Sequence, residues 1–295
     1  MFSIEQLADL AQKHRDALNS RVHEFAVKGR LISSNSHKSI MGVINLSPDS
    51  WYRESVCLTT DAAIRRAHVL QEQGADLIDL GAESTLSQAA LVDGQLQNSK
   101  LLPVLRGLKD LRIPISVETY NLEVAGKCLE TGASVINLTG NQNSEEFYRL
   151  AKDFDAAVII CFVQGSNVRE VGEFDLSRDP IRAMYEYFCR EIEKAQKFSL
   201  QKLFIDPGLG FYYKNLQDSE FRVRHQLNVF LNTFRLRALG FPICHALPHA
   251  FEYFGDEVRC AEPFFAVMAT LGKTDLFRTH EVTKTKAVLD SLSLL

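Results

Sequence analysis

Two stretches of the chain match: Glu72-Gln73-Gly74-Ala75-Asp76-Leu77-Ile78-Asp79-Leu80 and Glu130-Thr131-Gly132-Ala133-Ser134-Val135-Ile136-Asn137-Leu138. In each stretch a glycine follows an amphipathic segment, one small residue follows the glycine, and an apolar run begins. This order is expected where a helix ends in a glycine cap and a strand follows it. The two stretches therefore predict a repeated helix–strand unit, in which Asp79 and Asn137 occupy the same position of their strands.

Short apolar runs of this kind recur along the chain. They span residues 39–46, 76–82, 113–120, 134–140, 156–163, 203–210, 242–247 and 275–280. The runs are apolar on both faces, which is typical of parallel strands covered by helices. Amphipathic segments such as 60–73 and 223–239 lie between them. Because none of the runs resembles an edge strand, the eight units predict an α/β fold closed as a (β/α)8 TIM barrel.

The barrel is expected to form one domain, residues 37–295, behind an N-terminal helical extension, residues 1–36. The length of 295 residues suits this fold, which typically needs about 250 residues. Apolar residues of the extension recur every three or four positions, at Ile4, Leu7, Leu10, Ala11, Leu18, Val22 and Phe25. This spacing predicts one or two amphipathic helices, which we expect to close the N-terminal mouth of the barrel or to join a dimer contact.

The bulk composition excludes several classes of partner. The net charge of −4 and the pI of about 6.1 give no electrostatic case for nucleic acid or for an anionic membrane. The longest apolar run, 156–163, is too short to span a bilayer, and no signal peptide is recognisable. The six cysteines contain no CxxC pair, so we expect buried, reduced thiols in a cytoplasmic protein.

Polar residues collect at the C-terminal ends of the predicted strands, where barrel enzymes have their sites. The set comprises Asn45, Ser47, Asp49, Glu83, Ser84, Thr85, Glu118, Asn137, Asp206, His245, His249, Arg278 and His280. A single Asn or Asp at a strand end is usually a turn residue. Convergence from seven strand ends instead indicates a ligand site.

The residue types in this set suit a flat heterocycle. Glu118, Asn137 and Asp206 together offer two carboxylates and one amide, which match the amino-pyrimidinone edge of a pterin. The guanidinium of Arg278 can stack on such a ring. A second group, Asn45, Thr85 and His280, could hold an anion or a metal-bound group at the mouth of the barrel.

Two histidines leave a metal site open as an alternative. His245 and His249 are four residues apart, but Pro248 between them excludes a regular helix. With His280 they would form a three-histidine site.

The strand ends also resemble the motifs of a known family. Residues 40–50 (IMGVINLSPDS) and 74–85 (GADLIDLGAEST) resemble the first two signatures of dihydropteroate synthases. Further motifs follow in the order of that family, namely residues 115–120 (ISVETY), Asn137, residues 206–211 (DPGLGF) and residues 277–282 (FRTHEV). The resemblance covers roughly residues 39–292.

The resemblance implies an activity, a cofactor and site residues. The family joins a dihydropterin methyl diphosphate to p-aminobenzoate in folate biosynthesis, with Mg²⁺, and its members are homodimers. Carried over by position, the pterin-binding residues are Glu118, Asn137, Asp206, Phe211 and Arg278. The diphosphate would be held by Asn45, Thr85 and His280, with Asn45 as the metal ligand. The catalytic residues would be Asp206, Glu118 and His249, the last of which stands where the family has a lysine.

The chain departs from the family at the groups that handle the second substrate and the diphosphate. Leu86 replaces an arginine, and residues 247–250 (LPHA) replace a Ser-Arg-Lys-Ser segment. Residues 51–55 (WYRES) lack the glycines of the family's first loop, and Glu118 replaces an aspartate. Losing two charge-assisted contacts of about 1.5–3 kcal/mol each could weaken diphosphate binding by roughly several hundred-fold. Arg53 or Lys214 could supply a substitute charge.

Three functions therefore remain open. The first is a transferase of the dihydropteroate synthase type, with weak activity or an altered acceptor. The second is a barrel that binds a methylated tetrahydrofolate and passes on its methyl group, although residues 45–50 and 278–280 argue against it. The third is a non-catalytic pterin-binding or scaffold subunit, which the replacements at Leu86 and at 247–250 favour.

Overall fold

The computed structural model describes residues 3–50, 52–84, 92–211 and 213–294. Eight parallel strands form one sheet in the order β8-β7-β6-β5-β4-β3-β10-β9. Ile205 and Ile243 form a parallel bridge between its two ends, so the sheet is a nearly closed barrel. This confirms the predicted (β/α)8 barrel. The strands are β3 (Ser39–Asn45), β4 (Leu77–Gly81), β5 (Ile115–Thr119), β6 (Val135–Leu138), β7 (Ala157–Cys161), β8 (Leu203–Asp206), β9 (Cys244–Ala246) and β10 (Leu276–Thr279).

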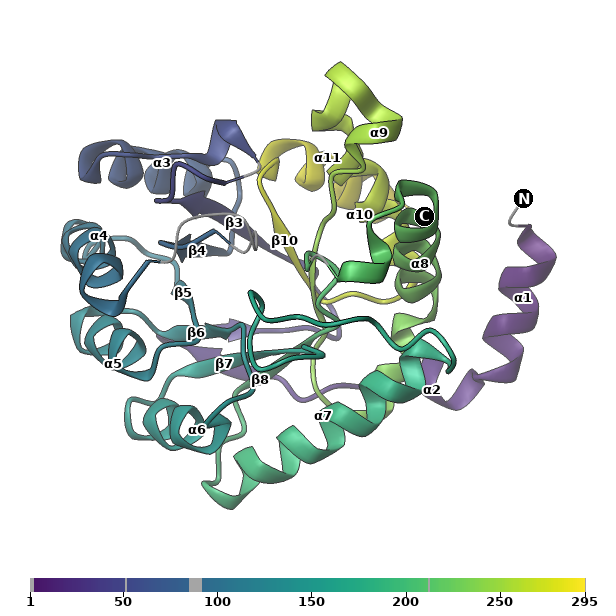
Figure 1. Cartoon of the computed structure of the whole chain (residues 1–295). Coiled ribbons are helices and arrows are strands. Elements are labelled where there is room, and N and C mark those ends of the chain that lie inside the picture. The colour runs from purple at the N-terminus through teal and green to yellow at the C-terminus, as the bar shows by residue number, and fades with distance from the viewer. Residues whose placement is uncertain (1–2, 51, 85–91, 212, 295) are drawn as a thin grey trace.

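Helices surround the strands, as Figure 1 shows. They are α3 (Thr60–Glu72), α4 (Gly94–Gly107), α5 (Leu122–Thr131), α6 (Ser144–Asp153), α7 (Pro180–Lys197), α8 (Ser219–Asn232), α9 (Phe251–Phe254), α10 (Ala261–Leu271) and α11 (Val282–Leu292). Short 3₁₀ turns are η1 (Arg53–Ser55), η2 (Lys214–Leu216), η3 (Thr233–Leu239) and η4 (Gly255–Cys260).

The segment expected as one helix over 223–239 is two elements, α8 followed by η3. The α-helix begins earlier than expected because the side chain of Asp218 accepts a hydrogen bond from the backbone N–H of Phe221. It changes to a 3₁₀ helix at Thr233, whose hydroxyl donates to the carbonyl of Val229 at 2.6 Å.

The predicted glycine stops are present at both repeated units. Gly74 and Gly132 have φ angles of +100° and +118°, a conformation that favours glycine. Gly132 caps α5 with its N–H on the carbonyls of Cys128 and Leu129. The strands that follow, β4 and β6, are buried along their whole length. The matching stretches therefore do encode equivalent units of the barrel.

The N-terminal extension corrects one expectation. Residues 4–19 form α1 (Ile4–Lys13) and α2 (Arg15–Asn19), but a hairpin of β1 (Phe25–Val27) and β2 (Arg30–Ile32) follows them. Lys28 and Gly29 both have positive φ, as a two-residue hairpin turn requires. The hairpin packs on the barrel, because Phe25 contacts Phe204 of β8 edge-to-face. The short helix α2 also reaches the barrel, since Lys273 donates a hydrogen bond to the carbonyl of Leu18. No residue of α1 is buried, and this helix stands apart from the barrel in Figure 1.

Two further expectations concern the surface and the cysteines. Within the described ranges, no helix is both long enough and apolar enough to cross a membrane. Cys128, Cys161 and Cys244 are buried free thiols, as expected, whereas Cys260 is exposed. Its position in η4, on the outside of the barrel, explains the difference.

Candidate functional site

Strand register brings the central polar residues together. In the parallel ladder, Glu118 of β5 pairs with Gly81 of β4 and with Asn137 of β6. Asp206 pairs with Cys161 at the end of β8 and β7. Because these positions lie at the C-terminal ends of neighbouring strands, their side chains meet at one mouth of the barrel.

All five residues expected to bind a pterin line one pocket, which contains Glu118, Asn137, Asp206, Phe211 and Arg278. A larger pocket adjoins it and shares Glu118, Phe211 and Arg278. The larger pocket is also lined by Asn45, His249 and His280. The structure therefore gathers the predicted residues that it describes around two adjoining spaces. Thr85 and Leu86 lie outside the described residues.

The floor of the site is a buried charge network. Nε of Arg278 donates to Oδ2 of Asp79 at 2.7 Å, and Nη2 donates to the carboxylate of Glu118. The same Asp79 oxygen accepts from Nδ2 of Asn137 at 3.0 Å. Asp79 was not among the expected site residues. Its equivalence to Asn137 in the matching stretches was the signal that could have identified it.

Burial raises the pKa of both site carboxyls. Desolvation raises the pKa of Glu118 to about 7, although Arg278 opposes the shift. Desolvation likewise raises the pKa of Asp206 to about 6, against the hydrogen bond from the N–H of Gly208. Near neutral pH, Asp206 is therefore mostly ionised, while Glu118 exchanges between its two forms. Such a pair can accept and donate hydrogen bonds at one ligand edge.

Asn137 and Asp206 are held rigidly. The thiol of Cys161 donates to Oδ1 of Asn137 at 3.3 Å, which fixes the amide between the thiol and Asp79. Oδ1 of Asp206 accepts from the backbone N–H of Gly208 at 2.7 Å. Gly208 has a φ of +72°, and a Cβ there would lie 2.4 Å from the carbonyl oxygen of Phe162. The turn that holds Asp206 therefore requires glycine.

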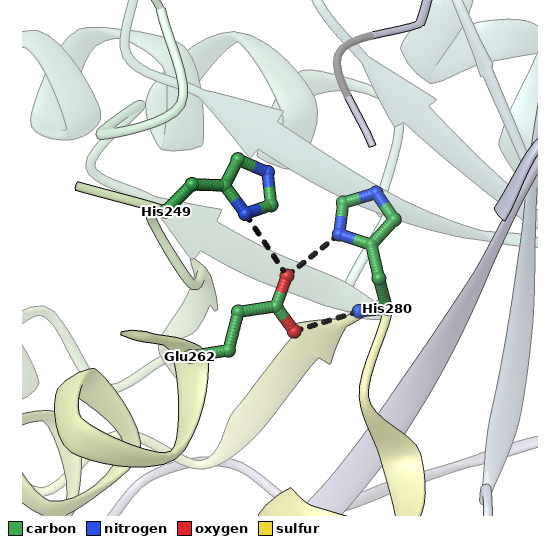
Figure 2. Close-up of side chains that lie close together, drawn as sticks. All are labelled: His249, Glu262 and His280. Atoms are coloured by element: carbon green, nitrogen blue, oxygen red, sulfur yellow. Dashed lines mark hydrogen bonds and ion pairs between the residues drawn. The ribbon is translucent and has the colours of Figure 1, made fainter. Parts of the chain in front are cut away.

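A second cluster lies at the mouth of the barrel, where two imidazole rings point toward Glu262 (Figure 2). Nδ1 of His280 lies 2.7 Å from Oε1 of Glu262, and Nδ1 of His249 lies 3.6 Å from the same oxygen. Burial opposes the charge of Glu262, but His280 and its other hydrogen bonds outweigh it and lower the pKa to about 2. Burial lowers the pKa of His249 to about 4. His249 is therefore neutral at pH 7 and does not replace the charge of a lysine.

The three-histidine alternative is wrong. His245 is fully buried on β9, and its Nε2 lies 2.9 Å from the hydroxyl of Thr233 in η3. Its ring also packs against Phe230 of α8. The side chain thus points into the helix layer, because alternate residues of a strand face opposite sides. Glu262 of α10 takes the third place beside His249 and His280.

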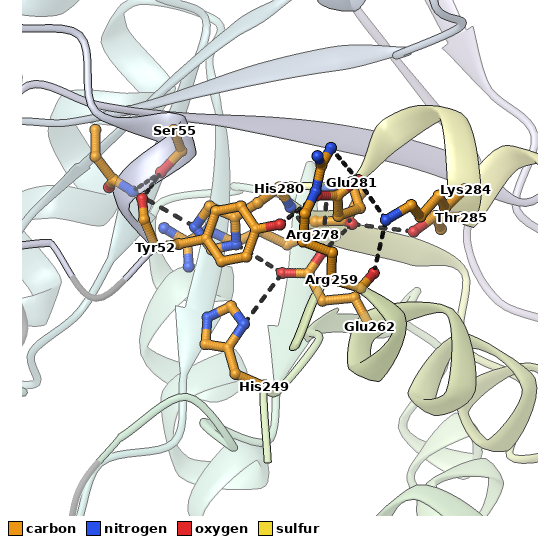
Figure 3. Close-up of polar contacts among 12 residues, drawn as sticks. Tyr52, Ser55, His249, Arg259, Glu262, Arg278, His280, Glu281, Lys284 and Thr285 are labelled. Carbon is orange, nitrogen blue, oxygen red and sulfur yellow. Dashed lines mark hydrogen bonds and ion pairs between the residues drawn. The ribbon is translucent and has the colours of Figure 1, made fainter. Parts of the chain in front are cut away.

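Tyr52 is a buried residue of the first loop that was not expected in the site. Its ring stacks on His280 at 4.7 Å and on His249 at 5.2 Å between centroids. Its hydroxyl donates to Glu281, which also pairs with Arg259 (Figure 3). Burial raises the pKa of the Tyr52 phenol, so it stays protonated. The absence of glycine from residues 51–55 was the only signal of this different loop.

Asn45 offers little to a magnesium ion. Its Nδ2 donates to Oγ of Ser55 at 2.6 Å and lies 3.4 Å from Nε2 of His280. One neutral amide oxygen remains on this side chain, whereas Mg²⁺ usually takes carboxylates and substrate phosphates. An ion at Asn45 would therefore depend on phosphate oxygens of a bound substrate.

The cations suggested as substitutes do not line the described pockets. Arg53 donates to the carbonyl of Pro48 and is exposed, and Lys214 is exposed on η2. Other arginines lie closer to the mouth. Arg222 lines the larger pocket, and Nη1 of the buried Arg169 donates to the carbonyl of Ser84 at 3.0 Å. Arg222 lies in α8 and Arg169 in the loop after β7, and no motif pointed to either residue.

The chain is similar to known proteins along most of its length. Residues 41–244 match the family described as pterin binding enzyme. The chain is 31% identical over 182 residues to the folate synthesis bifunctional protein of Arabidopsis thaliana, of which it covers only 37%. It is 28% identical over 259 residues to dihydropteroate synthase type-3 of Escherichia coli, with 86% of this chain and 97% of that protein covered.

The chain is also similar to a solved structure of a dihydropteroate synthase. A dihydropteroate synthase from Clostridium difficile, crystallised in the presence of pteroic acid, is 27% identical with a TM-score of 0.73. The similarity covers 88% of this chain and 97% of that one.

Proposed function

The chain belongs to the pterin binding enzyme family, and on that premise we propose that it binds a dihydropterin and acts as a weak or altered transferase of the dihydropteroate synthase type. The observation that carries the proposal is the pocket lined by Glu118, Asn137, Asp206, Phe211 and Arg278. A pterin presents adjacent N–H and C=O groups along one edge, and this pocket offers carboxylate and amide partners for both.

In this proposal each residue of the pocket has a role. The ionised Asp206 and the amide of Asn137 orient the pyrimidinone edge. Glu118, with a pKa of about 7, accepts or donates a hydrogen bond there. Arg278 leaves its ion pairs with Asp79 and Glu118 to stack on the ring, and Phe211 closes the other side. We therefore expect binding of the pterin ring to compete with the ion pairs that Arg278 forms with Asp79 and Glu118.

The proposed reaction transfers the pterin methylene group. The bond between the methylene carbon and the diphosphate oxygen breaks with its electron pair leaving on diphosphate. The nitrogen of an arylamine forms the new bond to that carbon and loses a proton. Asp206 and Glu118 would stabilise the positive charge that develops on the pterin. Mg²⁺, if bound, would neutralise charge on the departing diphosphate, with Asn45 as its protein ligand.

We infer that ordinary synthesis is slow. His249, which stands where the family has a lysine, is neutral because burial lowers its pKa to about 4. Pro248 cannot supply a charge, and Leu86 replaces the arginine of the family's second signature. The cations that the family has at these three positions are therefore absent when charge develops on the diphosphate.

A second candidate function is pterin binding without catalysis. The buried ring of Tyr52 covers His280 and His249 by stacking, and these two residues line the part of the site where the diphosphate is expected. A tyrosine held in this position by Glu281 would limit access to that part while leaving the pterin pocket open.

A coupled assay separates these functions. The protein is incubated with the pterin diphosphate and p-aminobenzoate at saturating Mg²⁺, and dihydropteroate is measured by chromatography. We expect turnover well below about 1 s⁻¹, the lower limit of ordinary enzymes. Turnover at or above that rate would contradict the weak-transferase proposal. Complete absence of product, with retained pterin binding, would support the second candidate.

A further inference from the structure

We propose that His249, Glu262 and His280 bind one divalent transition-metal ion, with Zn²⁺ the best chemical match. One ligand atom from each residue lies within 4.8 Å of the others. Two imidazoles and one carboxylate form a zinc ligand set that leaves one coordination position open. The residues come from the loop after β9, from α10 and from the end of β10 (Figure 2).

The spacing of the ligand atoms suits such an ion. Tetrahedral bonds of about 2.0–2.2 Å place neighbouring ligand atoms about 3.3 Å apart. The two distances to Oε1 of Glu262 are 2.7 Å from His280 and 3.6 Å from His249. Both distances therefore lie within about 0.6 Å of the spacing that a tetrahedral ion requires.

Glu262 is fixed in the orientation that a ligand requires. Its Oε2 accepts hydrogen bonds from the hydroxyl of Thr279 and from the backbone N–H groups of His280 and Glu281, the latter two at 2.8 and 3.1 Å. This leaves Oε1 facing the two imidazoles. Supporting hydrogen bonds of this kind orient the carboxylate ligands of metal sites.

His249 provides the independent observation that points to a ligand. Its Nδ1 is buried and has no hydrogen-bond partner among the described residues, although the ring faces Glu262. A buried polar atom without a partner is rare and calls for an explanation. A histidine that served only to pair with Glu262 would sit within hydrogen-bond distance, as His280 does. A lone pair directed at a metal ion accounts for the gap.

The surroundings of His280 allow the required tautomer. Coordination through Nδ1 places the ring proton on Nε2, which lies 3.4 Å from the side-chain amide of Asn45. Rotation of that amide would present its oxygen as the acceptor. Tyr52 stacks on both imidazoles, so the rings are held in place (Figure 3).

The ion would restore positive charge to the site. His249 and His280 line the larger pocket beside Arg278, so the open coordination position would take water or a phosphate oxygen there. This role rests on the proposed function, whereas metal binding itself does not. The nitrogen-rich ligand set favours Zn²⁺ over Mg²⁺, which prefers oxygen ligands.

The test measures metal binding without any pterin. The full chain is stripped with a chelator, and Zn²⁺ is titrated in competition with a chromophoric chelator. Co²⁺ is added separately to record the visible absorption of a four-coordinate site. We expect one ion per chain. His249→Phe keeps a ring to stack on Tyr52 but removes the ligand, and it should weaken Zn²⁺ binding by about 100-fold or more, whereas Thr279→Val, which loosens Glu262, should weaken it about tenfold.

The matched control is His68→Ala, an exposed histidine of α3, which should bind Zn²⁺ like the wild type. Thermal unfolding of each variant shows whether it is folded, and a folded His249→Phe protein carries the test. Absence of stoichiometric Zn²⁺ binding would overturn the proposal. Equal binding by the wild type and the folded His249→Phe protein would overturn it as well. Either failure would leave the pterin proposal standing, because no pterin is present.

Discussion

Arg278 and Glu118 form an ion pair across the barrel, from β10 and β5, two strands that are separated by β3 and β4 in the sheet. Asp79 of β4 lies between them and binds the same guanidinium. One cation thus pairs with two buried carboxyl groups beside the pocket proposed to bind the pterin. The network is both a structural element and the feature that a ligand must rearrange.

Removing this cation should be costly. Arg278→Met leaves Asp79 and Glu118 buried without their partner, and we expect the free energy of unfolding to fall by about 3–5 kcal/mol. Urea denaturation followed by circular dichroism measures the loss. Arg182→Ala, which breaks an exposed pair with Glu186, should change stability by less than about 1 kcal/mol. Equal losses of stability in the two variants would contradict the claim that Arg278 stabilises the fold by pairing with Asp79 and Glu118.

The raised pKa of Glu118 predicts a pH dependence of stability. The pKa is 4.5 for the unperturbed group and about 7 in the fold, so the folded state binds the extra proton between these values. Protonated Glu118 therefore makes its full contribution to the free energy of unfolding below about pH 4.5. This contribution is lost as the pH rises to about 7. Other groups also titrate in this range, so the comparison is with Glu118→Gln.

As the pH rises from about 4.5 to about 7, the wild type should lose roughly 1–3 kcal/mol of unfolding free energy relative to Glu118→Gln. Urea denaturation at a series of pH values gives this difference directly. A difference that stays constant with pH would mean that Glu118 keeps an ordinary pKa in the fold.

The surface of α10 bears on the expected homodimer. Phe264 and Leu271 are 42% and 50% exposed, and they lie two helical turns apart on one face. We expect Phe264→Glu to give a monomer and the wild type a dimer at micromolar concentration in sedimentation velocity. Leu96→Glu changes an equally exposed apolar residue of α4 and should leave the dimer intact. A wild type that sediments as a monomer would contradict the expected homodimer.

The weak-transferase proposal predicts that activity can be raised. In protein stripped of transition metals and supplied with Mg²⁺ alone, restoring two of the lost cations by Leu86→Arg with His249→Lys should increase dihydropteroate formation at least about tenfold, since one charge-assisted contact is worth about 1.5–3 kcal/mol. The single variant Leu86→Arg separates the two contributions and retains His249. If the double variant is folded and no faster than the wild type, these positions do not account for the slow rate.

The barrel was predictable because its signals are local and repeated. Each of the eight barrel strands lies within a run that is apolar on both faces, and glycines such as Gly132 mark where the helices stop. The gathering of Glu118, Asn137 and Asp206 in one pocket followed from polar residues at the ends of those runs. The β1–β2 hairpin was missed because strands of three residues are too short to produce a recognisable alternation beside a helical pattern.

The remaining site residues depend on contacts between distant parts of the chain. Glu262 lies in an apolar helix where no motif pointed to it, yet its carboxylate is fully buried against His280. Tyr52 enters the site through stacking on His249 and His280, and the missing glycines of residues 51–55 indicate a different loop but not this contact. His245 looked equivalent to His249, but the alternation of β9 turns it toward the helices. Only the three-dimensional arrangement distinguishes these cases.

The most direct test of the account is calorimetric titration with a dihydropterin alcohol, which lacks the diphosphate and so reports on the pterin pocket alone. We predict one binding site per chain. Asp206→Ala should weaken binding by about 10–100-fold, the equivalent of about 1.5–3 kcal/mol for a charged hydrogen bond, and Asp61→Ala, at an exposed position of α3, should have no effect. Absence of binding to the wild type, or equal binding by a folded Asp206→Ala protein, would contradict the account.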